Sequence, residues 1–528
     1  MLFNSYEFLF IFLPLTLLGY QLAARWHRQA VVIWLSLASL AFYGYWSPRY
    51  LILLCGSILF NYVSGCLISR RIPNRINSGL LLTVAIGINV GALCYYKYLF
   101  PTLSFLVAIT GRAHGWQNIV LPLGISFFTF TQIAYLVDLQ QGAVRQQDLG
   151  SYTLFATFFP HLIAGPILHH AEVMPQFQQN KDYRLRADDL AVGLSWFAMG
   201  LFKKVMLADK FAPGADAAFD SVYRLSTPAA WAGVLAFALQ LYFDFSGYSD
   251  MALGLARMFS IDFPLNFSSP YKAASITDFW QRWHMTLTRY INAYLYNPVF
   301  LWINRRRLAK GKKVSRKAMA TPAGFATMVA FPTMFSLFIA GIWHGAGLQF
   351  ILFGLLHGTY LSINQAWRTF QANRPNAVAP SKARIRLNYV SGVLLTFVGV
   401  CVAHVFFRSP NVWVAFSIVA SMFGLHYHPA AAVVMLPAPV SSPAPYYPSL
   451  GRWASLVLGY GIVWGLPNTQ QILLKFKPAI SVTKSDTMPG PLSILWRPTI
   501  AWAVVLGLAF FYTVIRMENP SSFLYFQF

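Results

Sequence analysis

Charged residues are scarce in this 528-residue chain: they make up 11% of it, and only 16 of them are Asp or Glu. An average soluble domain carries about 25% charged residues. Hydrophobic residues account for 57% of the chain, and apolar runs of membrane-spanning length recur from end to end. The composition therefore predicts an all-α polytopic membrane protein that forms a single integral-membrane domain over residues 1–528.

Cysteine is also scarce, and the four that occur lie in apolar runs without CxxC pairing or His-rich spacing. We therefore expect reduced core cysteines, and neither a disulfide framework nor a metal site. The chain lacks a Gly-rich phosphate loop, a GxSxG elbow and an HExxH pair. These absences disfavour a P-loop ATPase, a serine hydrolase and a zinc protease. A transfer reaction that uses histidine and needs no metal remains open.

The apolar runs predict about 11–15 transmembrane or re-entrant helices. The first run, Phe8–Tyr20, lacks a basic flank and a small-residue cleavage site, so we expect a retained helix and not a cleaved signal peptide. No internal repeat is evident, which weighs against the transporter folds that are built from repeats.

Basic residues give the chain a net charge of +24, and they gather between the apolar runs. This distribution favours cytoplasmic loops over a nucleic-acid surface. The strongest marker is the loop 304–320, which carries eight basic residues and no acid. We expect this loop to be cytoplasmic and close to anionic lipid headgroups. The distribution of basic residues also predicts a periplasmic N-terminus and an outward-facing tail over 516–528. The uncharged stretch Pro429–Pro448 predicts an outer or re-entrant loop.

Two Trp-His pairs, Trp283-His284 and Trp343-His344, lie in mostly apolar surroundings. An ionisable side chain at membrane depth is costly, so both histidines are candidate functional residues. Glycines surround His344 and allow close approach of another backbone or of a ligand. A buried neutral imidazole there can act as a general base. The alternative is a structural histidine that hydrogen-bonds a neighbouring helix.

His284 follows a polar cluster. If one helix runs through it, Asp278 caps the helix start and pairs with Arg282, while Gln281 and Thr288 share the face of His284. The alternative is that this cluster only caps an interfacial helix.

Other polar residues stand in apolar runs. Asp244 and Asp250 could orient an imidazole, or pair with Arg257 or Lys272. For His357 we expect packing or a hydrogen bond. The stretch 160–166, which begins and ends with proline, predicts a helix break.

Several stretches together resemble a known family, the membrane-bound O-acyltransferases, and within it the bacterial branch typified by the alginate O-acetylation protein. The stretches are LPLGISFFTFTQIAYLVD (121–138), FFPHLIAGPI (158–167), GLFKKVMLAD (200–209), LYFDFSGYSDMALGLARMF (241–259), DFWQRWHMTLTRYINAYLY (278–296), GIWHGAGLQFILFGLLHG (341–358), LPNTQQI (466–472) and FLYFQF (523–528). They span nearly the whole chain. One departure is that relatives continue DYLYIPLGGNR where this chain reads AYLYNPVFLWINRRR.

The resemblance implies helices around a central funnel and an acyl transferase in the bacterial inner membrane. It implies that acetyl-CoA is the cytosolic donor, with no permanently bound cofactor and no metal. The acceptor it implies is an exported polysaccharide such as cellulose or alginate, reached with a periplasmic SGNH-type partner. The family's invariant histidine corresponds to His344 and its second histidine to His284. As candidate donor-binding residues we take Trp283, Trp343, Asp244 and Asp250.

The terminal FLYFQF places one nucleophile, Tyr525, near the end of the chain. A phenol is weakly nucleophilic at its usual pKa of about 10, but an adjacent imidazole base activates it. Tyr525 is therefore a candidate acetyl relay activated by His344. The alternative is an aromatic anchor at the membrane interface.

Two functions from other classes compete with acetyl transfer: a polysaccharide or lipid transporter, and a membrane scaffold that recruits a periplasmic transferase. The lack of repeats and the scarcity of membrane-embedded charge weigh against the transporter. The scaffold predicts full activity after His344→Ala.

Overall fold

The computed structural model describes residues 1–69, 77–110, 120–145, 148–178, 183–220, 225–372, 381–425, 446, 448–476, 479–480, 492, 494–517 and 523–524. Apart from one isolated bridge between Pro264 and Ile480, these residues contain helices and loops only, which confirms the all-α prediction. The four cysteines are all free, as expected, but only Cys401 is buried. Cys55 and Cys94 are exposed and Cys66 is partly exposed, so the prediction that they lie in the core is wrong for these three.

The chain divides into two compact units, and each is described by itself. Unit 1 comprises residues 1–206, 244–265 and 469–527, and unit 2 comprises 207–243, 266–468 and 528. The long helix α12 (Thr227–Met258) contributes its first half to unit 2 and, from Asp244 on, its second half to unit 1.

Unit 1 begins with long apolar helices. Its helices besides α12 are η1 (Phe8–Phe12), α1 (Leu13–Ala24), α2 (Arg28–Trp46), α3 (Pro48–Ser69), α4 (Ser78–Lys97), α5 (Leu99–Thr110), α6 (Ile125–Gln140), α7 (Leu149–Thr157), α8 (Phe159–Leu162), α9 (His170–Gln178), α10 (Ala187–Phe202), α24 (Thr469–Ile472), η7 (Leu474–Phe476) and α25 (Ile500–Ile515), and η2 (Lys203–Ala208) begins in it.

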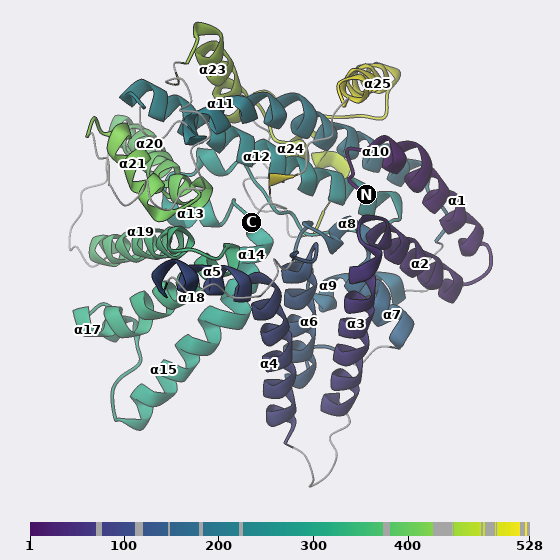
Figure 1. Ribbon diagram of the computed structural model, residues 1–528, viewed down its shortest axis with the longest axis horizontal. Coiled ribbons are helices and arrows are strands. Elements are labelled where there is room, and N and C mark those ends of the chain that lie inside the picture. The colour runs from purple at the N-terminus through teal and green to yellow at the C-terminus, as the bar shows by residue number, and fades with distance from the viewer. Residues whose placement is uncertain are drawn as a thin grey trace. The chain divides into compact units, whose positions relative to one another are not determined.

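Helices α3, α4 and α6 run side by side (Figure 1). Asn61 of α3 and Asn89 of α4 exchange two amide hydrogen bonds, of 3.0 and 2.8 Å, and both side chains are buried. Polar pairs of this kind join helices where lipid offers no hydrogen-bond partner.

Helices α10 and α12 cross through glycines spaced seven residues apart. A Cβ added to Gly193 would lie 2.6 Å from the carbonyl oxygen of Gly254, and one added to Gly200 would lie 2.7 Å from that of Gly247. Only glycine lets the two backbones come this close. The crossing brings the lysines that follow α10 next to the acidic residues of α12.

The predicted helix break is present. Helix α8 ends at Leu162, and a Cβ on Gly165 would lie 2.4 Å from the Cα of His161. The ring of His161 bonds to the carbonyl oxygen of Phe155 at 3.0 Å, so its imidazole helps satisfy the interrupted backbone.

Unit 2 carries both Trp-His pairs. Its elements besides the first half of α12 are α11 (Asp209–Asp220), η4 (Pro270–Lys272), α13 (Ile276–Trp280), α14 (Met285–Ile291), η5 (Asn292–Tyr296), α15 (Asn297–Ala309), α16 (Arg316–Met319), α17 (Pro322–Phe325), η6 (Ala326–Ala330), α18 (Phe331–His344), α19 (Leu348–Ala372), α20 (Lys382–Arg408), α21 (Val412–Met422) and α23 (Leu450–Gly465).

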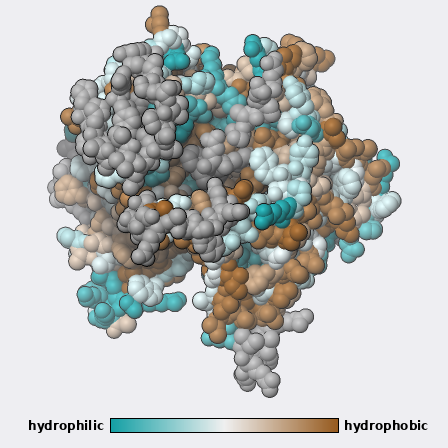
Figure 2. Space-filling view, in the orientation of Figure 1, coloured by the Kyte–Doolittle hydropathy of each residue, from teal (hydrophilic) through white to brown (hydrophobic). Residues whose placement is uncertain are grey.

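Seven helices of the described chain are long and apolar enough to cross a membrane, and three shorter helices are also apolar. Apolar side chains are exposed along them, including Ile52 and Leu59 of α3 and Val84 and Ile88 of α4. Figure 2 shows this hydrophobic surface over α3 and α4. Large exposed apolar surfaces mark contacts with a membrane or a partner, and on helices of spanning length they support a multi-pass membrane protein.

Candidate functional site

His344 is the last residue of α18 and is buried. Its ring contacts three aromatic rings, with centroid distances of 4.7 Å to Trp343, 5.6 Å to Phe353 and 5.2 Å to Phe407. The C-terminal end of a helix carries partial negative charge. Basic residues are favoured at this end, and a neutral imidazole placed there can act as a general base.

The glycine before the Trp-His pair serves helix packing. A Cβ on Gly341 would lie 2.4 Å from the carbonyl oxygen of Phe350, and one on Gly354 would lie 2.3 Å from that of Leu337. Helices α18 and α19 therefore cross with their backbones in contact. Of the two uses expected for this glycine, close approach of another backbone is the one that the structure confirms.

His344 belongs to an aromatic layer that reaches His357. Phe353 lies 5.6 Å from His344 on one side and 4.8 Å from His357 on the other. The indole N–H of Trp280 donates to Nδ1 of His357 at 3.3 Å. The expectation of packing and a hydrogen bond for His357 is confirmed.

The same layer continues to the second Trp-His pair. His357 stacks on Phe279 at 6.2 Å, and Phe279 stacks on Trp283 at 5.7 Å. Phe267 lies 5.1 Å from Trp283 and 6.5 Å from His284. Unit 2 thus links both candidate histidines through one continuous set of buried rings.

The helix expected through His284 is absent. Helix α13 ends at Trp280, α14 begins at Met285, and His284 between them has φ 42° and ψ 53°, the left-handed conformation. The prediction that Gln281 and Thr288 share its helical face is wrong, because the chain turns at this point. A non-glycine residue in this conformation is strained and is kept only where its surroundings enforce it.

The polar cluster before His284 also differs in part from the arrangement predicted from the sequence. The pair between Asp278 and Arg282 forms at 2.7 Å, as the spacing of four predicts. The N-cap of α13, however, is Ser275, whose hydroxyl accepts from the backbone N–H of Asp278. Asp278 in turn accepts from the N–H of Ala274, the residue before the N-cap, so it supports the helix start and is not itself the cap.

Asn266 fixes the tautomer of His284. Its Oδ1 accepts from the backbone N–H of Thr286 at 3.4 Å and from the hydroxyl of Thr286 at 2.9 Å, and it lies 2.9 Å from Nδ1 of His284. A backbone N–H can only donate, so the Asn266 atom must be the oxygen, and Nδ1 must carry a proton toward it. The lone pair of the neutral ring therefore lies on Nε2.

The two tryptophans predicted to bind the donor are both buried. Trp343 lies against His344, and Trp283 packs on Phe267, Phe279 and His404. The Trp343 indole therefore packs directly on its neighbouring histidine, whereas Trp283 is joined to His284 through Phe267. A contact with the donor stays a prediction.

Asp244 and Asp250 pair with lysines that the sequence did not suggest. Asp244 lies 2.7 Å from Lys204, and each side chain is 2% exposed. Asp250 lies 2.6 Å from Lys203 and accepts further hydrogen bonds from Trp196 and Thr469. The expectation of Arg257 or Lys272 as partner is wrong: Arg257 binds Asp189 and Asp262, and Lys272 donates to the carbonyl oxygen of Leu466.

The C-terminal tail is anchored at the first of these pairs. The backbone N–H of Leu524 donates to Asp244 at 3.0 Å, and the ring of Phe523 lies 5.0 Å from the Lys204 ammonium. Phe523 also meets Tyr248 edge to face at 4.6 Å. Phe523 is 1% exposed and Leu524 6% exposed, so this part of the tail is buried in protein. Tyr525 lies outside the described residues.

Two features of the site were not among the predictions made from the sequence, although one of them had a signal there. The adjacent lysines 203 and 204 stand in an otherwise apolar stretch, and buried lysines require a partner, so this signal was readable. The role of Asn266 could not be predicted, because asparagine is common in loops and its contact with His284 is visible only in the folded chain.

The chain matches the family model of the membrane-bound O-acyltransferases over residues 31–315. It is 34% identical to a peptidoglycan O-acetyltransferase of Helicobacter pylori, over 100% of this chain and 98% of that one. It is 36% identical to a probable alginate O-acetylase AlgI of Azotobacter vinelandii, over 80% and 78% of the two chains. A teichoic acid D-alanyltransferase of Streptococcus thermophilus is 26% identical over 59% of this chain and 75% of that one. The chain belongs to the membrane-bound O-acyltransferase family, and it is a multi-pass membrane O-acyltransferase.

Proposed function

We propose that this enzyme takes an acetyl group from acetyl-CoA on the cytosolic side of the inner membrane and passes it outward for O-acetylation of an exported polysaccharide. Relatives named for acetylating peptidoglycan and alginate match it over 80% or more of its length and support this substrate class. The observation that carries the proposal is His344, a buried imidazole at a helix C-terminus, linked through aromatic rings to a second buried histidine.

In the reaction, the acceptor hydroxyl oxygen attacks the carbonyl carbon of the thioester. A C–O bond forms and the C–S bond breaks. His344 takes the hydroxyl proton and returns it to the departing thiolate, so coenzyme A leaves as the free thiol. His284, whose Nδ1–H is held by Asn266, presents its Nε2 lone pair to orient a hydroxyl or thiol.

The first acceptor in this proposal is the Tyr525 phenol. Leu524, the residue before it, is held by Asp244, and Phe523 is buried against Tyr248. These two contacts favour a tail that is seated in the protein over an aromatic anchor in the lipid interface. The resulting tyrosyl acetate is then consumed by an SGNH-type partner in the periplasm.

Intact-protein mass spectrometry after incubation with acetyl-CoA tests this function. We expect a gain of one acetyl group in the wild type and in Tyr512→Phe, a control on the exposed face of α25. We expect no gain in Tyr525→Phe or in His344→Ala.

If no adduct forms, but partner and polymer drive loss of acetyl-CoA that depends on His344, transfer is direct and the relay is wrong. If His344→Ala leaves both assays unchanged, the catalytic role of His344 is wrong.

A further inference from the structure

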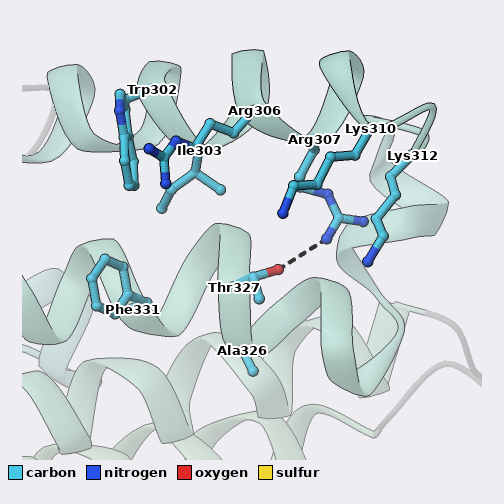
Figure 3. A pocket seen from close by; sticks show the side chains of 9 residues that line it. All are labelled: Trp302, Ile303, Arg306, Arg307, Lys310, Lys312, Ala326, Thr327 and Phe331. Carbon is cyan, nitrogen blue, oxygen red and sulfur yellow. Dashed lines mark hydrogen bonds between the residues drawn. The ribbon is translucent and has the colours of Figure 1, made fainter.

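A cavity of about 440 Å³ lies in unit 2 between α15 and the segment formed by α17, η6 and the start of α18. It is separate from both Trp-His pairs. The lining residues, labelled in Figure 3, are Trp302, Ile303, Arg306, Arg307, Lys310, Lys312, Ala326, Thr327 and Phe331.

One end of this cavity is cationic. Figure 3 shows Arg307, Lys310 and Lys312 gathered there. The Arg307 guanidinium donates to the Thr327 hydroxyl at 3.1 Å and to the Lys313 carbonyl oxygen at 3.5 Å. Its Nε is buried and has no hydrogen-bond partner among the described residues. Neutral oxygens fix this guanidinium in position and leave its charge uncompensated.

The surrounding sequence supplies no counter-charge. Between Asp278 and Asp486 the chain contains no Asp or Glu at all. No described carboxylate lies within ion-pair distance of the three cations. Cations crowded around a cavity repel one another, so an anion from outside the chain stabilises them.

The other end is apolar and aromatic. Trp302 and Phe331 lie there, and the Arg306 guanidinium covers the Trp302 ring at 4.2 Å (Figure 3). Apolar surface continues beyond the cavity, since Phe335 on α18 stacks on Phe331 at 6.3 Å and is 36% exposed.

We propose that this cavity binds one anionic phospholipid, with its phosphate at Arg307, Lys310 and Lys312 and its acyl chains along Trp302 and Phe331. Basic pockets beside membrane helices suit such headgroups. A phosphate-bearing nucleotide is the competing source of anionic charge. It fits less well, because Arg306 already covers a face of Trp302 on which a base would stack, and because the apolar end opens onto exposed helix surface.

Native mass spectrometry of the delipidated full-length protein tests this site. Phosphatidylglycerol is the probe, phosphatidylcholine the zwitterionic control, and coenzyme A the competing phosphate source. The cavity variant is Arg307→Gln/Lys310→Gln/Lys312→Gln. Its matched control, Arg305→Gln/Lys313→Gln/Lys317→Gln, removes the same residue types from the same loop outside the cavity lining.

We expect the wild type and the control variant to bind one phosphatidylglycerol with similar affinity, and both to bind it more tightly than phosphatidylcholine. The cavity variant should bind it about a hundredfold more weakly, since each basic residue near an anionic lipid contributes about fivefold. Trp302→Ala should also weaken binding while leaving every charge of the cationic end in place.

Three results overturn the proposal. Equal losses in the two triple variants would mean that the loop attracts lipid by its total charge alone. Equal binding of the two lipids would remove the role of the anionic headgroup. Displacement of phosphatidylglycerol by coenzyme A, with loss of both ligands in the cavity variant, would assign the cavity to the donor.

Discussion

Removing Lys204 leaves a buried carboxylate without its neighbouring ammonium. Lys204 and Asp244 are each 2% exposed and lie 2.7 Å apart. Breaking a buried ion pair by deleting one partner costs about 3–5 kcal/mol, because the remaining charge stays desolvated. We therefore expect Lys204→Met to destabilise unit 1 by about this amount. Thermal unfolding in detergent should show a fall in Tm of several degrees or more, at about 2–4 °C per kcal/mol for a domain of 150–250 residues.

The adjacent ion pair supplies a matched control. Lys203 is 17% exposed, and its partner Asp250 keeps hydrogen bonds from Trp196 and Thr469. For Lys203→Met we expect a smaller loss, about 1–2 kcal/mol, since Asp250 remains hydrogen-bonded and partly hydrated.

The double variant Lys204→Met/Asp244→Asn separates charge from packing. It removes both charges but keeps an oxygen that accepts from the Leu524 N–H. We expect it to recover most of the stability that Lys204→Met loses. Equal losses in Lys203→Met and Lys204→Met, or a double variant no more stable than Lys204→Met, would refute the reasoning.

Three further perturbations probe other parts of the structure. Asn266→Ala should lower the transfer rate about 10- to 100-fold, because the buried hydrogen bond that fixes His284 is worth about 1–3 kcal/mol; steady-state kinetics measure this. Gly341→Ala should cost about 1–3 kcal/mol in thermal unfolding, since its Cβ would lie 2.4 Å from the Phe350 carbonyl oxygen. Burial lowers the pKa of His170 to about 4, so the unfolded chain takes up the proton first and stability falls as pH drops from about 6.5 toward 4. At pH 5 the loss is about 2 kcal/mol, and it should be smaller in His170→Phe.

Each of these three perturbations has its own control variant and its own contradicting result. Thr286→Val, which removes another donor to Asn266, should change the rate less than Asn266→Ala; the reverse order would contradict the tautomer argument. Gly507→Ala adds a Cβ with no neighbour within 4 Å and should not destabilise. If Gly341→Ala is equally harmless, the α18–α19 contact is looser than described. An unchanged pH profile in His170→Phe would assign the acid sensitivity to other groups.

Local sequence determined the class of this protein. Long apolar runs and scarce charge depend on composition alone, so the all-α membrane fold was predictable from the chain. A spacing of four positions was equally informative: Asp278 and Arg282 form the ion pair that the pattern indicates, although α13 ends at Trp280. The break at 160–166 followed from the conformational limits of proline and glycine.

Contacts between separate helices could be decided only by the tertiary structure. Asp250 pairs with a lysine 47 positions earlier, and Arg257, proposed as its partner, is occupied by two other carboxylates. The left-handed turn at His284 and the hydrogen bond of its ring to Asn266, 18 positions earlier, also depend on how the chain folds back on itself. Hydrophobic patterning predicts which face of a helix is buried. Which polar group lies opposite on the facing helix depends on how the two backbones cross, and between α10 and α12 glycines set that crossing.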